Sequence, residues 1–197
     1  MVDPGSFEDS YGVSPAEWLG RPAKEVYARL REMDTLRVAA TCRATLHDRA
    51  LLLDVSLAYE ESLREIAFEC EVGSPDDCTA GWVRRSVERA IDRLLERQLE
   101  EERRRETFDP NDHRLVVELF ELAPHQGRTA SVRFHSLPVR VRRIFRVLVL
   151  EDRPLVDAVE MGLGGRSEIL GAILTAFETV GATISPEHLS MELGGQG

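Results

Sequence analysis

Short polar breaks between apolar segments constrain this sequence more than any other feature. Three apolar segments, at 36–46, 50–59 and 63–72, follow one another with breaks of only three residues. Breaks of that length are typical of antiparallel strands joined by hairpin turns. In the third segment the side chains alternate, which predicts one face packed on a core and one face lined with carboxylates. The residues predicted to face the core are Ile66, Phe68, Cys70 and Val72. Those predicted on the carboxylate-lined face are Glu65, Ala67, Glu69 and Glu71.

The second half of the chain repeats this pattern, and helices flank both groups of strands. Three more strand-like segments lie at 114–122, 129–137 and 139–150. The spacing of apolar residues predicts a long helix over 79–106, whose charged last two turns we expect to stand in solvent. A last edge strand is predicted at 188–193. The fold class is therefore α+β, with mainly antiparallel sheet, flanking helices and the order α-βββ-α-βββ-αα.

The same pattern suggests how the chain is organised. Residues 1–13 are predicted to form a flexible N-terminal arm and residues 194–197 a flexible tail. The charged end of the long helix divides a first α+β lobe at 14–108 from a second at 114–193. These lobes are either separate or parts of one continuous domain.

The predicted order of elements over residues 14–136 is similar to that of small acidic type III secretion chaperones. Those proteins run helix, three strands, helix, two strands, helix. The likeness lies in element order and in no motif. It implies a chaperone-like function, namely binding a protein partner.

Net charge and hydropathy indicate in which cellular compartment the protein is expected. The chain has 25 basic and 35 acidic side chains, a net charge of -10, which argues against its whole surface lying on nucleic acid or anionic lipid. No transmembrane run or signal peptide is recognised, so we expect a cytoplasmic protein without membrane contact. Cys42, Cys70 and Cys78 match no zinc or redox motif, and their spacing leaves open whether any of them is reactive.

The glycine-rich segment MGLGGRSEILGAILTAF, at 161–177, raises the question of a phosphate-binding loop. It lacks the lysine and the spacing of a Walker loop, and its glycines do not have the spacing of the dinucleotide fingerprint. A junction between two helices explains it better. Gly162 then ends a short helix in the left-handed conformation, Ser167 caps the next helix, and Gly181 ends that one.

A catalytic or metal site is not recognisable. The histidines are dispersed, and no two have the spacing of ligands on a helix. The DPNDHR segment begins like a calcium loop at Asp109, but Arg114 stands where glycine is needed and Phe120 where the closing acid is needed. No cofactor motif is found. The histidines are His47, His113, His125, His135 and His188.

Arginines are concentrated in one part of the chain. Residues 126–153 hold seven arginines against Glu151 and Asp152, so this part carries +5 in a chain of net charge -10. On strands, alternate arginines such as Arg140 and Arg142 share a face and suit phosphates or an acidic protein. Alternatively, they pair with the chain's own carboxylates. The candidate anion- or partner-binding residues are Arg128, Arg133, Arg140, Arg142, Arg143, Arg146 and Arg166.

Three functions follow, in order of preference. The first is a non-catalytic interaction, regulatory or adaptor protein that binds a protein partner, including a second copy of itself as a homodimer. The second is a binder of an anionic ligand, either nucleic acid or a phosphorylated small molecule, through the arginine-rich segment. The third is an enzyme whose site is assembled from distant segments.

Overall fold

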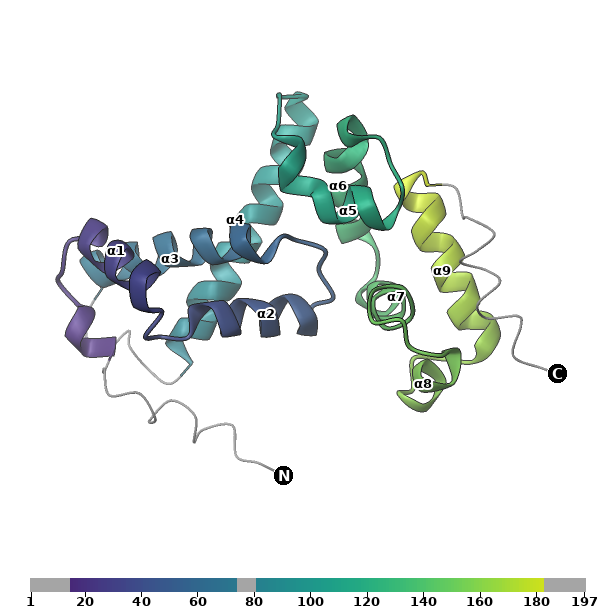
Figure 1. The fold of residues 1–197 in the computed structure, drawn as a ribbon, viewed down its shortest axis with the longest axis horizontal. Helices are drawn as coiled ribbons and strands as arrows, with labels where there is room; N and C mark the ends of the chain where they lie inside the picture. The colour runs from purple at the N-terminus through teal and green to yellow at the C-terminus, as the bar shows by residue number, and fades with distance from the viewer. Residues whose placement is uncertain (1–14, 74–80, 183–197) are drawn as a thin grey trace. The chain divides into compact units, whose positions relative to one another are not determined.

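The computed structural model describes residues 15–73 and 81–182, and every regular element in these ranges is helical (Figure 1). The predicted α+β fold with antiparallel sheets is therefore wrong, because the described part of the chain contains no strand. The likeness to type III secretion chaperones depended on those strands and is lost with them. The predicted edge strand at 188–193, the N-terminal arm and the tail lie outside the described residues.

Contacts divide the chain into two compact units, one from residues 1–46 and 55–96, the other from 47–54 and 97–197. The helices of the first unit are η2 (Pro15–Trp18), α1 (Ala23–Met33), most of α2 (Val38–Asp48), α3 (Val55–Val72) and the first part of α4 (Trp82–Arg104). Those of the second are η4 (Pro110–His113), α5 (Arg114–Leu119), η5 (Pro124–Gln126), α6 (Gly127–Ser136), α7 (Val139–Phe145), the π-helical η6 (Arg146–Leu150), α8 (Leu155–Glu160) and α9 (Arg166–Val180).

In the first unit, α1 packs beside α3 (Figure 1). Val26 and Leu30 form the buried stripe of α1, and the hydroxyl of Tyr59 on α3 donates to the carbonyl oxygen of Leu30 at 3.4 Å. Asp34 ends α1 in the left-handed conformation, with φ of 41°. Its carboxylate then accepts a hydrogen bond of 2.7 Å from the amide of Val38, so one residue closes α1 and caps α2.

In the second unit, α9 runs beside α7 and α8 (Figure 1). The core of this unit is built around four buried phenylalanines: Phe120 directly after α5, Phe134 on α6, Phe145 at the end of α7 and Phe177 on α9. The rings of Phe120 and Phe145 are stacked with centroids 4.8 Å apart, and Phe134 meets Phe145 edge-on at 5.3 Å. Offset-stacked and edge-on contacts are the favoured geometries of aromatic pairs.

The strand prediction failed because the wrong residues were assigned to the core. Along α3 the buried residues recur every three or four positions, as on a helix. Phe68 and Val72, which the alternation assigns to the dry face, are 54% and 63% exposed, and Glu65 from the acidic set is buried. The segment at 139–150 is helical too, so Arg140 and Arg142 do not share a face.

Several local predictions are confirmed. The long helix predicted over 79–106 is α4, although its second half is not simply solvated, since Gln98 is buried. Gly162 has a φ of 73° after α8, and Gly181 ends α9 with a φ of 84°. The cap of α9 is Gly165, not Ser167; the Gly165 amide donates to the Glu168 carboxylate at 3.0 Å. No helix in the described ranges is long and apolar enough to cross a bilayer.

The loop before α3 belongs to the second unit and is held there by a histidine. Leu51, Leu52 and Leu53 are all buried, and the amide of Leu52 donates to Nε2 of His135 on α6 at 3.1 Å. This hydrogen bond requires an unprotonated Nε2. Burial, together with the positive charge of Arg142, lowers the pKa of His135 to about 3.

His135→Gln should make the second unit less sensitive to acid. Because the folded state lowers the pKa of this imidazole, its neutral form contributes stability that is present above pH 6.5 and is lost as pH falls toward 3. Between pH 7 and pH 5 this loss amounts to about 2 kcal/mol. Glutamine keeps an acceptor for the Leu52 amide but does not titrate in this range. Urea midpoints at both pH values measure the difference, and an equal acid loss in both proteins would contradict the assignment.

Candidate functional site

The arginines predicted as a binding stripe are spread over separate helices. Arg128 and Arg133 lie on α6, and Arg140, Arg142 and Arg143 lie on α7. Arg146 begins the π-helical η6, and Arg166 begins α9. In helices, successive arginines point in different directions, so the even stripe expected of a strand does not form.

Several of these arginines bind groups of their own unit. Arg128 is buried and pairs with Glu102 of α4 at 3.0 Å. Arg140 pairs with Glu168 at 3.0 Å and also donates to the carbonyl oxygen of Leu163. Arg146 pairs with Glu151 at 3.0 Å, and Arg143 donates to the backbone carbonyl of Asp48 at 3.2 Å. Whether the seven residues bind an anion or a partner stays a prediction.

A connected polar cluster of the first unit joins α3 to α4. Glu65 and Glu69 lie one helical turn apart on α3, so both face α4. Glu69 accepts hydrogen bonds from Nε1 of Trp82 at 2.8 Å and from the hydroxyl of Ser86 at 2.7 Å. It also pairs with Arg89, which stands 3.5 Å from Glu65.

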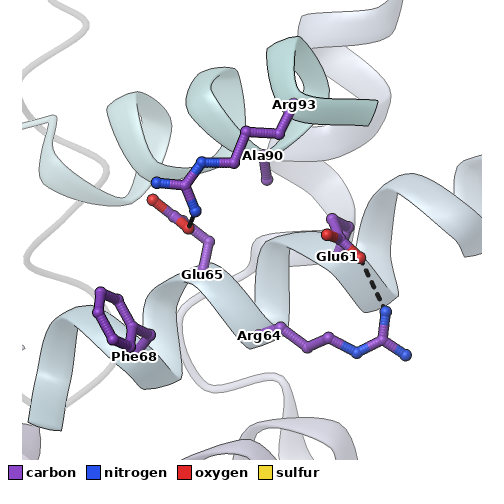
Figure 2. Close-up of a pocket in the computed structure, with 6 residues that line it drawn as sticks. All are labelled: Glu61, Arg64, Glu65, Phe68, Ala90 and Arg93. Atoms are coloured by element: carbon purple, nitrogen blue, oxygen red, sulfur yellow. Dashed lines mark hydrogen bonds and ion pairs between the residues drawn. The ribbon is translucent and has the colours of Figure 1, made fainter. Parts of the chain in front are cut away.

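Glu65 is bound from the other side by Arg93. Figure 2 shows this arginine reaching from α4 to the Glu65 carboxylate. Glu65 is buried with its charge compensated by Arg93 and Arg89. A buried carboxylate is tolerated in this way only where cations and hydrogen bonds replace the lost water. Because Arg89 pairs with Glu69 as well, the cluster is one connected network and not two separate ion pairs.

The pKa values of the two carboxyl groups are shifted in opposite directions. Burial, helped by its hydrogen bond with Glu69, raises the pKa of Glu65. Burial acts in the same sense on Glu69, but hydrogen bonds from Ser86 and Arg89 outweigh it and lower the pKa of that carboxyl. Carboxyl groups whose pKa values are driven apart can serve as an acid and a base. Here the donors of α4 occupy them, and the arrangement fixes α3 against α4.

A hollow lies beside this cluster on the surface of the first unit. Its volume is about 270 Å³, and Figure 2 shows the residues around it. Ala90 of α4 points into it, and Arg64 turns along α3 to bind Glu61 at 2.8 Å. Phe68 lines the hollow with its ring more than half exposed. The residues that line it are Glu61, Arg64, Glu65, Phe68, Ala90 and Arg93.

Sequence reasoning did not single out this site. Glu65 and Glu69 were assigned to the wet face of a strand, and Phe68 to its dry face. A helical interpretation of 55–72 would have placed Phe68 opposite the buried Ile66 and Cys70, and a large apolar residue in that position is the signal that was missed.

The described residues hold no group of three or more His, Cys, Asp or Glu side chains arranged for a metal ion. Cys42 and Cys70 are buried thiols, and Cys78 lies outside the described ranges. Comparison with protein-family models, with curated proteins and with solved structures finds no match.

Proposed function

We propose that this protein is a cytoplasmic, non-catalytic interaction protein that docks a protein partner on the outward face of α3, the side of the helix on which Phe68 is exposed. The observation that carries the proposal is the exposure of Phe68, which lines the hollow of the first unit, and of Val72, one turn further along α3. Burying a large apolar side chain is worth about 1.5–3 kcal/mol, and aromatic residues are enriched among the anchors of interfaces.

The buried side of α3 supports this role. Leu63, Ile66 and Cys70 are fully buried in the first unit, and the Glu65–Glu69 network ties the helix to α4. The outward face is therefore presented by a helix that is fixed on two sides. Affinity gains when an interface is ordered before binding, since less conformational entropy is lost.

The rim of the hollow is balanced in charge. Glu61 and Glu65 alternate with Arg64 and Arg93, and each arginine is paired with an acid. A strongly anionic partner such as nucleic acid needs an excess of basic side chains, and this rim does not provide one. A protein surface with both charge signs around an apolar centre fits better.

Photo-crosslinking tests the proposal. A benzophenone amino acid replaces Phe68 in the full chain, and a matched variant carries it at Val156 on α8, which is 56% exposed. We expect irradiation to give a discrete protein adduct from position 68 and none from position 156. An adduct from position 156 alone would place docking on the second unit and contradict the proposal.

A further inference from the structure

The outward face of α3 carries a pattern that identifies one occupant, and the inference rests on the proposed function. We propose that a second copy of this chain docks there, with the two α3 helices packed antiparallel about a two-fold axis. The axis passes beside the helix between Ser62 and Leu63.

Four residues define this face: Leu57, Glu61, Arg64 and Phe68. At about 100° per residue they lie within about 60° of one another around the helix. The buried side chains of Ile66 and Cys70 are on the opposite side. Arg64 and Phe68 are exposed, and Leu57 and Glu61 are partly exposed, so the face is open along three turns.

The four residues form a pattern that is symmetric about the proposed axis. Glu61 and Arg64 stand equally far from it on either side, and so do Leu57 and Phe68. In an antiparallel pair, Glu61 therefore meets Arg64 of the second copy, and Phe68 meets Leu57 of the second copy. A two-fold interface must be complementary to itself, and this pattern satisfies that condition in both charge and apolarity.

The charges are also positioned before association. Arg64 already binds Glu61 of its own helix at 2.8 Å. Two such pairs brought together across the axis form a ring of four charges that alternate in sign. The intrachain pair reduces the side-chain entropy lost on docking.

The size of the contact predicts a weak dimer. The span from Leu57 to Phe68 covers about 17 Å of helix axis at 1.5 Å per residue. A single helix pair of that length is smaller than a standard stable interface. We therefore expect a dimer that dissociates on dilution and that weakens as salt screens the exposed charges.

Sedimentation velocity of the full chain across a concentration series tests the pairing through charge exchange. Glu61→Arg places two arginines opposite each other at both ends of the ring, and Arg64→Glu places two glutamates there. Each variant alone should dimerise about tenfold more weakly or worse, since like charges across an interface repel. An equimolar mixture of the two should recover the dimer, because every opposed pair then has opposite signs.

Arg114→Glu is the matched control, since Arg114 and Glu118 form an exposed pair on α5, which belongs to the second unit. It should dimerise like the wild type. The proposal is overturned if the wild type stays monomeric up to the highest soluble concentration, or if the mixture remains as monomeric as its components. The crosslinking experiment separates this failure from that of the proposed function. An adduct at position 68 of another mass would keep docking on α3 but exclude the second copy.

Discussion

Phe145→Ala should lower the free energy of unfolding of the second unit by about 3–5 kcal/mol. The ring of Phe145 is fully buried and contacts Phe120, Phe134 and Phe177. Truncation removes its transfer free energy and leaves a cavity among three large rings that cannot all close around it. Far-UV circular dichroism during urea denaturation measures the loss.

Tryptophan fluorescence helps to assign this loss of stability to one of the two units. Trp18 and Trp82, the two tryptophans of the chain, belong to the first unit. Phe68→Ala is the control: its ring is exposed, so we expect a change of less than about 1 kcal/mol. A loss for Phe145→Ala no larger than that of the control would contradict the placement of the phenylalanine core.

Glu69→Ala should destabilise the first unit by about 2–4 kcal/mol. The substitution removes the acceptor for Nε1 of Trp82 and a partner of Ser86, and both of these residues are buried. It also removes a carboxylate partner of Arg89. Buried donors that lose their acceptor retain the cost of desolvation. Tryptophan fluorescence during urea denaturation reports this change directly, since Trp82 is itself a partner.

Glu69→Gln separates hydrogen bonding from charge. The amide oxygen still accepts a hydrogen bond, so we expect the loss to be about half that of the alanine variant. The depressed pKa of Glu69 adds a pH dependence: its ionised form stabilises the fold above the unfolded-state pKa, and this contribution is lost as pH falls through the lower folded-state pKa. Identical losses for the two variants would show that the oxygen acceptors do not matter.

The sequence allowed individual helices to be predicted but not the fold class. Helix α4 and the junction at Gly162 and Gly181 were predictable because caps, left-handed glycines and spacing of apolar residues are local signals. The segment at 63–72 was wrongly predicted as a strand because Phe68 and Val72 are apolar although they are exposed to solvent on a helix. Apolar side chains on both faces of a helix mimic the alternation of a strand.

The segment at 139–150 failed for a different reason. It is rich in β-branched residues, which favour strands when local propensity is considered alone. In the structure, Ile144, Phe145 and Leu148 are buried in the cores of the second unit, and this packing outweighs propensity. The arginine stripe was inferred from the predicted strand at 139–150. Because this segment is helical, alternate arginines do not lie on one face and the stripe does not form. The polar cluster of Glu65 and Glu69 depends on α4, and contacts between distant segments leave no pattern in a single sequence.

Resonance assignment of the isotopically labelled chain, followed by a dilution series, tests the central claim most directly. We expect helical Cα shifts throughout 55–72, and concentration-dependent shifts centred on Leu57, Glu61, Arg64 and Phe68. Strand-type shifts over 55–72 would contradict the helical fold. Concentration-dependent shifts confined to α8 and α9 would show that self-association uses another surface and contradict docking of a second copy on α3.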